Sequence, residues 1–133
     1  MLCSQEVIFT NLCKIRDGDK VVVMERLNQD WPGVTFPGDH VERGESIVSS
    51  VIQEVKKETG LTVSNLELCG IQNWTDPTDH YRYLVFCCKT SHFQSLYSLL
   101  MKGRIFWIDY VDLKKRPQLE DDFGVILVSV IDR

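Results

Sequence analysis

Residues 36–61 read FPGDHVERGESIVSSVIQEVKKETGL, and this stretch decides the fold. Its first ten residues have the proline and glycine punctuation that is typical of a loop. The following residues are apolar at positions 47, 48, 51, 52 and 55, which is one stripe of a helix with 3.6 residues per turn. Ser46 is suited to cap the start of this helix, and Gly60 is suited to end it. The sequence therefore predicts a loop that leads into an amphipathic helix over residues 46–59.

Two glutamates, Glu54 and Glu58, lie in the second half of this helix. Because they are four residues apart, their side chains lie on one face of the helix. Like charges at this spacing repel each other unless a divalent cation lies between them. Mg²⁺ prefers oxygen ligands, and the carbonyl of Gly38 can supply one more. The alternative interpretation is a solvated helix face, on which these glutamates and Lys56 and Lys57 only keep the protein soluble.

The rest of the chain predicts strands on both sides of this segment. The pair Asp17-Gly18 is a hairpin signal between two apolar runs. The predicted strands are 6–15, 20–26, 34–36, 61–72, 81–89 and 103–110, with a loop at 73–80 and a closing helix at 119–131. No clear prediction is made for residues 90–102. The order predicts a single α/β domain over residues 1–133, in which a mixed β-sheet lies between α-helices.

Composition and charge exclude several classes of function. The net charge is −4, and no basic stripe is visible, so a nucleic-acid polymer is not an expected partner. No run of eighteen apolar residues occurs, so no membrane span or membrane partner is expected, and the start of the chain lacks the features of a signal peptide. The five cysteines form no CxxC pair, which is typical of reduced thiols. These features predict a cytoplasmic protein.

The segment from residue 39 to residue 61 resembles the motif of the Nudix hydrolase family. That motif reads Gly, five residues, Glu, seven residues, Arg-Glu, an aliphatic residue, any residue, Glu-Glu, any residue, Gly and an aliphatic residue. The positions that match at the right spacing are Glu45, Glu54, Val55, Glu58, Gly60 and Leu61. The flanking residues 36–38 and 40–45 also look like the family, and the order of elements is similar over nearly the whole chain. The resemblance implies a Nudix fold of the MutT-like kind.

The resemblance also implies a reaction and a role for each matching residue. Water would attack a phosphorus of a nucleoside diphosphate linked to another group X, and Mg²⁺ or Mn²⁺ would offset the charge of the leaving phosphate. Glu58 and the carbonyl of Gly38 would bind the metal ion. Glu54 would be a further metal ligand or the base that activates water, and Glu45 would steady the loop and the helix.

Three positions of the motif depart from the family. Asp39 replaces a glycine, Gln53 replaces an arginine, and Lys57 replaces a glutamate. Lys57 puts an ammonium where the family has a carboxylate, so it is expected to lower the metal affinity, unless it contacts a substrate phosphate directly. Asp39 either adds an oxygen ligand or strains the turn. In addition, no Asp or Glu occurs from residue 80 to residue 108, where many relatives supply a further glutamate.

Aromatic and amide side chains beside the turn signals are candidates for binding the base of a substrate. Trp31 and Trp74 lie near proline-containing turns, and Asn73 has an amide that can read the edge of a base. The resemblance suggests an oxidised purine triphosphate such as 8-oxo-dGTP. Two functions stay open: a metal-dependent pyrophosphohydrolase, or a catalytically impaired Nudix domain that binds a nucleotide or a protein partner. A small-molecule nucleotide is the expected ligand, and a homodimer is left open.

Overall fold

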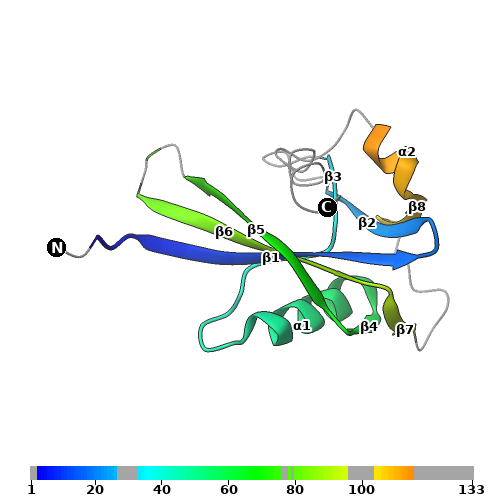
Figure 1. The fold of residues 1–133 in the computed structure, drawn as a ribbon, viewed down its shortest axis with the longest axis horizontal. Coiled ribbons are helices and arrows are strands. Elements are labelled where there is room, and N and C mark those ends of the chain that lie inside the picture. Colours follow the sequence, from blue (N-terminus) through cyan, green and yellow to red (C-terminus); the bar gives the residue numbers. More distant parts are fainter. Residues whose placement is uncertain (1–2, 27–32, 76–77, 79, 96–103, 116–133) are drawn as a thin grey trace.

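Eight strands and two helices make up the part of the chain that the computed structural model describes, which is residues 3–26, 33–75, 78, 80–95 and 104–115 (Figure 1). The strands are β1 (Glu6–Asp17), β2 (Lys20–Arg26), β3 (Gly33–Thr35), β4 (Leu61–Ser64), β5 (Glu67–Thr75), β6 (Tyr81–Thr90), β7 (His92–Ser95) and β8 (Ile105–Asp109). The helices are α1 (Ile47–Thr59) and α2 (Tyr110–Lys115). Neither helix of this described part is long and apolar enough to cross a membrane.

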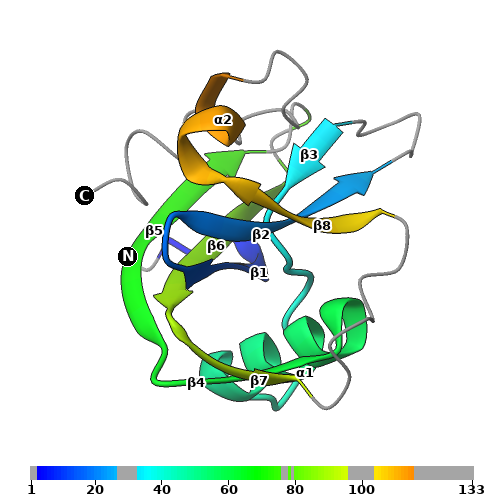
Figure 2. The same ribbon diagram turned by 90° about the vertical axis from the view of Figure 1, so that its right-hand side faces the viewer.

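A mixed sheet is built from two arms that meet at the hairpin between β1 and β2 (Figure 2). In one arm, β6 runs parallel to β1, and β5 pairs antiparallel with β6. In the other arm, β2 pairs antiparallel with both β3 and β8. The hairpin turns at Gly18, whose φ of 61° is one that glycine adopts without steric cost. The predicted hairpin is therefore confirmed.

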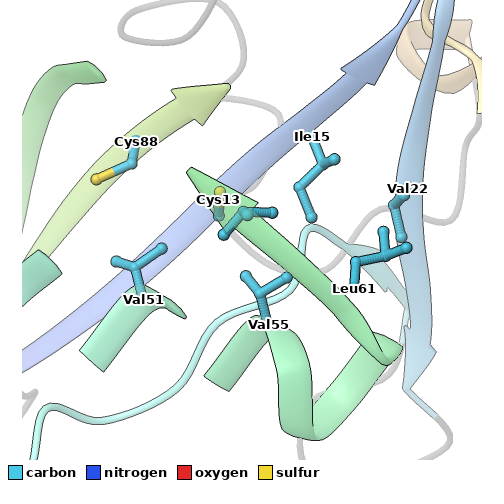
Figure 3. Close-up of a cluster of buried hydrophobic side chains, with 8 residues drawn as sticks. Cys13, Ile15, Val22, Val51, Val55, Leu61 and Cys88 are labelled. Atoms are coloured by element: carbon cyan, nitrogen blue, oxygen red, sulfur yellow. The ribbon is translucent and has the colours of Figure 1, made fainter. Parts of the chain in front are cut away.

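Helix α1 covers one face of the first arm. Its side chains Val51 and Val55 are fully buried, and in Figure 3 they point toward Cys13 of β1 and Cys88 of β6. Cys13 and Cys88 are direct neighbours in the parallel pairing of the two strands. Full burial of a valine side chain contributes about 1.5–3 kcal/mol to stability, so this apolar stripe holds the helix on the sheet.

Both ends of α1 have the caps that the sequence predicts. The hydroxyl of Ser46 accepts a hydrogen bond from the backbone N–H of Ser49 at 3.1 Å. At the other end, Gly60 has a φ of 79°, and its N–H donates to the carbonyl of Lys56 at 2.9 Å. The helix predicted over residues 46–59 is thus confirmed, with Ser46 as the capping residue just outside it.

Helix α2 lies on the opposite side of the molecule from α1 in both ribbon views (Figures 1 and 2). Its buried Leu113 belongs to a second apolar cluster, together with Val21, Val23, Phe36 and Val85. The arrangement confirms the predicted α/β class, a mixed sheet with helices on either side. The short helix α2 itself was not among the predicted elements, and the predicted closing helix at 119–131 lies outside the described residues.

Residues 61–75 differ from the prediction of one strand followed by a loop. The chain turns at Asn65, whose φ of 52° is left-handed, and two strands result. Strand β4 pairs with β7, whereas β5 pairs with β6 and continues to Thr75. The prediction of a loop from residue 73 was therefore wrong at its start, because pairing with β6 keeps residues 73–75 extended.

Candidate active site at the loop before helix α1

The loop between β3 and α1 is held along the edge of β1 by backbone hydrogen bonds. The N–H of Asn11 donates to the carbonyl of Asp39 at 3.0 Å, and the N–H of Cys13 donates to the carbonyl of Pro37 at 2.9 Å. The N–H of Val41 in turn donates to the carbonyl of Phe9 at 2.8 Å. The loop thus replaces a neighbouring strand along this part of β1, and its backbone positions are fixed.

Gly38 is the point at which the loop and β1 come closest. A Cβ atom at this position would lie 1.9 Å from the carbonyl oxygen of Asn11 and 2.9 Å from the Cα of Leu12. Both are backbone atoms of a paired strand, so they cannot move aside cheaply. The glycine is therefore required for close packing, whereas the sequence suggested only that it exposes a carbonyl to a metal ion.

The carboxylate of Glu58 reaches back from the last turn of α1 to this loop. One of its oxygens, Oε1, accepts a hydrogen bond from the N–H of Gly38 at 3.1 Å. Ser50, Glu54 and Glu58 are each four residues apart, so they form a row on one face of the helix. Glu58, the last member of this row, contacts the loop. Sequence reasoning placed Glu54 and Glu58 on one face, and the structure shows which element that face meets.

Glu54 lies in the middle of this row and is half-buried. Burial raises the pKa of its carboxyl, and the neighbouring carboxylates of Asp39, Glu45 and Glu42 raise that pKa further, whereas the ammonium of Lys57 lowers it. A concentration of negative charge around a partly buried carboxylate is the electrostatic setting that a bound cation would relieve. The predicted catalytic residues Glu54 and Glu45 thus lie within electrostatic range of each other.

Glu45 folds back on the loop just before the helix. Its side-chain oxygen Oε1 accepts a hydrogen bond from the N–H of Glu42 at 3.0 Å, and its own N–H donates to the carbonyl of Glu42 at 3.1 Å. These two bonds close a tight turn around Gly44, whose φ is 79°. The contacts agree with the steadying role that the resemblance implies for Glu45.

The three substituted positions of the motif are all exposed. Asp39 is exposed, and its Oδ1 accepts from the N–H of His40 at 2.7 Å and lies 2.9 Å from Nδ1 of the same residue. Asp39 does not have a positive φ, so its backbone does not adopt the left-handed conformation that favours glycine. Gln53 and Lys57 are both exposed on α1. All three departures can therefore be accommodated by the fold.

The donor chemistry of this site fits a hard divalent ion only in part. Among residues 3–26, 33–75, 78, 80–95 and 104–115, no three His, Cys, Asp or Glu side chains gather closely enough to hold a metal ion. Mg²⁺, however, is commonly bound by one or two carboxylates, with water and substrate phosphates supplying the other ligands. Glu54 and Glu58, beside the Gly38 loop, offer such a pair. The site fits an ion shared with a phosphate substrate.

The residues predicted to bind a base are not brought together. Successive residues of a strand face opposite sides, so Asn73 and Trp74 of β5 cannot line one pocket. Asn73 pairs with Leu84, which also pairs with Phe9, and this is the face of the sheet that carries α1. Trp74 lies on the other face, where its ring centroid is 6.2 Å from that of Tyr83. Trp31 lies outside the described residues.

Two buried polar residues of the site were missed by sequence reasoning. The side-chain amide of Asn11 donates to the hydroxyl of Ser50 at 2.7 Å, and both residues are almost fully buried. The Oδ1 atom of Asn11 also accepts from the N–H of Asp39 at 3.4 Å. A buried amide left without partners costs about 1–3 kcal/mol, so both contacts matter for stability. A polar residue inside an apolar strand was the available signal.

The fold and this loop-helix site define a Nudix domain, and the chain belongs to the Nudix family. The family model described as NUDIX domain matches residues 10–125. The uncharacterised Nudix hydrolase YvcI of Bacillus subtilis is 28% identical over 119 residues, which cover 86% of this chain and 73% of YvcI. The NAD-capped RNA hydrolase NudC of Pseudomonas aeruginosa is 45% identical over 62 residues, which cover 45% of this chain but only 22% of NudC.

A solved structure supports the same assignment at the level of the fold. The crystal structure of a MutT protein from Bacillus halodurans superimposes with a TM-score of 0.68 and 26% sequence identity. The match covers 84% of this chain and 74% of that protein. The predicted family and fold are therefore confirmed. Nudix hydrolases generally use divalent metal ions.

Proposed function

We propose that this chain is a Mg²⁺- or Mn²⁺-dependent pyrophosphohydrolase whose substrate is a nucleoside diphosphate linked to another group X. The observation that carries the proposal is the position of Glu54. This half-buried carboxylate interacts electrostatically with the neighbouring acidic groups of the loop. It belongs to the helix row whose next member, Glu58, is hydrogen-bonded to Gly38 at 3.1 Å. A solvated helix face would leave both carboxylates in water, without a loop beside them.

The residues of the site supply distinct parts of the proposed reaction. Glu54 and Glu58, with the Gly38 carbonyl, would hold the divalent ion, which when bound neutralises phosphate charge and lowers the pKa of bound water. Glu54 is the candidate base, because its raised pKa keeps it able to accept a proton nearer neutral pH. Glu45 keeps the loop in place through its bond to the N–H of Glu42.

The described activities and names of related proteins support the proposed substrate class. NudC is described as an NAD-capped RNA hydrolase, and NAD contains a nucleoside diphosphate linked to a second group. The matching crystal structure is that of a MutT protein. The resemblance to MutT-like proteins suggests that the substrate is an oxidised purine triphosphate such as 8-oxo-dGTP. Asn73, Trp74 and Lys57 stay candidates for substrate contacts, with Trp74 on the opposite face of the sheet from Asn73.

A substrate panel with matched variants tests this proposal. Release of phosphate, pyrophosphate or nucleoside monophosphate is measured with NAD, ADP-ribose, dGTP and 8-oxo-dGTP in the presence of Mg²⁺ or Mn²⁺. We expect turnover of at least one compound, and a loss of about 100-fold or more in Glu54→Gln. Glu67→Gln, a change of the same kind at an exposed position of β5, should leave the rate unchanged. Folded protein without turnover on the whole panel would refute the proposal.

Lys57 favours a second candidate function, a catalytically impaired Nudix domain that binds a nucleotide or a protein partner. Its ammonium lies close enough to Glu54 to lower the pKa of that carboxyl, as a competing cation would. Lys57→Glu separates the two functions. If Lys57 weakens metal binding, the variant should bind Mn²⁺ about tenfold more tightly and hydrolyse faster, whereas Lys56→Glu, the same change one residue earlier, should do neither. Unchanged binding in Lys57→Glu would mean that the charge is harmless.

A further inference from the structure

We infer that Asn11 is a positioning residue for the proposed metal site, because its buried side chain joins the middle of α1 to the loop that carries Gly38 and Asp39. The inference rests on the proposed function for its meaning in catalysis. Asn11 belongs to strand β1 and lies outside the motif of residues 39–61.

Asn11, a residue of strand β1, contacts both helix α1 and the loop before it. Its Nδ2 donates to Oγ of Ser50 on α1 at 2.7 Å, and its Oδ1 accepts from the N–H of Asp39 at 3.4 Å. Its backbone N–H also donates to the carbonyl of Asp39 at 3.0 Å. Asn11 is 2% exposed and Ser50 is fully buried, so water cannot replace these bonds cheaply.

The link through Asn11 ties the helix row to the loop at one end of the row. Ser50 begins the row Ser50, Glu54, Glu58 and is tied to β1 through Asn11. Glu58 ends the row and is tied to the N–H of Gly38 at 3.1 Å. Glu54 lies between them, one helical turn from each. The two ties therefore set where Glu54 stands relative to Asp39 and the Gly38 carbonyl.

An asparagine suits this place better than the other polar residues of similar size. An aspartate would add a buried negative charge beside Asp39, whose own side chain is a carboxylate. An apolar residue such as leucine would leave the hydroxyl of Ser50 and the N–H of Asp39 without the bonds that they make now. The neutral amide supplies one donor and one acceptor, which are the two groups required.

Ser50→Ala is the main test, because it removes the hydroxyl that Asn11 binds while alanine favours the helix. Asn11→Ala removes this bond and also the bond that Oδ1 accepts from the N–H of Asp39. Ser49→Ala is the matched control, since Ser49 is exposed on the same helix and its side chain has no part in the link. Two quantities are measured well below the melting temperature: the hydrogen-exchange rate of the Gly38 amide by NMR, and the affinity for Mn²⁺ by electron paramagnetic resonance.

If Asn11 positions the loop, Ser50→Ala and Asn11→Ala should each speed Gly38 exchange and weaken Mn²⁺ binding by about tenfold or more, because displacing a catalytic group by about 1 Å has effects of this size or larger. The double variant should add little to Asn11→Ala, since that change already removes the bond to Ser50. Ser49→Ala should match the wild type. Variants that melt lower, yet keep wild-type Gly38 exchange and Mn²⁺ affinity, would overturn the inference.

The two readouts also separate this inference from the proposed function. If the wild-type chain binds no Mn²⁺ and hydrolyses nothing in the panel, the proposed function fails. The exchange rate of the Gly38 amide still reports whether Asn11 holds the loop. Unchanged exchange in both single variants would then overturn the positioning role on its own.

Discussion

At the scale of single residues, Gly38 shows how the packing of the loop limits substitution. The Cβ of an alanine would lie 1.9 Å from the carbonyl oxygen of Asn11, so Gly38→Ala must push the loop away from β1. We expect the free energy of unfolding to fall by about 3 kcal/mol, as for a severe overpacking change. Urea denaturation of the variant measures this loss.

Gly44→Ala is the control for this prediction. Gly44 has a positive φ of 79°, but no heavy atom lies within 4 Å of the position that a Cβ would take. The cost is then only that of a left-handed alanine, about 1 kcal/mol. Equal losses in the two variants would show that backbone conformation, rather than contact with β1, explains the need for glycine at position 38.

Glu54 leads to a prediction about pH. Burial and then the carboxylate of Asp39 raise its pKa above the ordinary value of 4.5, so between that value and the raised one the folded state binds more protons than the unfolded state. Stability therefore falls as the pH rises through this window. Glu54→Gln removes the repulsion, so without metal it should be more stable than the wild type above the window, and the two should converge below pH 4.5.

The measurement is thermal unfolding of both proteins across this pH range in the presence of EDTA. Added Mn²⁺ should then stabilise the wild type more than Glu54→Gln, because only the wild type has the carboxylate. Glu67→Gln serves as the control, since it is an exposed carboxyl away from the loop. A wild type that gains stability relative to Glu54→Gln as the pH rises would contradict the assigned direction.

Three residues of the site show what the sequence could and could not predict. Glu54 and Glu58 are visible in the sequence, because their spacing alone places them on one face of a helix. The role of Asn11 depends on which loop lies beside β1, and no local pattern states this. The tie between Glu58 and the N–H of Gly38 is equally non-local, since the two residues are twenty positions apart.

At the scale of elements, local signals predicted α1 and failed for residues 61–75. The helix has its own cap residues and its own apolar stripe, so its neighbours are not needed to define it. Strands β4 and β5 carry similar apolar residues, and only their different partners, β7 and β6, separate them. The turn between them lies at Asn65, which has a positive φ. Asparagine tolerates this conformation, so its presence in the sequence was the available signal for a turn.

The packing of α1 gives a prediction at this scale. Val51 is fully buried against Cys13 and Cys88, whereas Val48 on the same helix is 56% exposed. Val51→Ala should lower the free energy of unfolding by about 2 kcal/mol, from lost burial and the cavity that remains. Val48→Ala should change it by less than about 0.5 kcal/mol. Similar losses from the two changes would mean that α1 does not bind the sheet through this stripe.

At the scale of the whole molecule, the site lies where the two arms of the sheet separate. Strand β2 pairs with β1 only at the hairpin end, through Arg16 and Asp17. Farther along the same strand, Phe9, Asn11 and Cys13 bond to the loop instead. The loop therefore fills the edge that β2 leaves, and hydrogen bonds to β1 hold it there.

This arrangement predicts that the chain folds without metal. Both apolar clusters consist of side chains other than the proposed metal ligands, so EDTA should leave the melting temperature unchanged. Mg²⁺ together with a nucleotide should raise it, because a ligand that binds only the folded state at about 100 times its Kd adds about 2.7 kcal/mol. Glu54→Gln should lose most of this gain and Glu67→Gln none of it. If the chain instead unfolds in EDTA, folding requires the metal ion, and contact with β1 is not enough to position the loop.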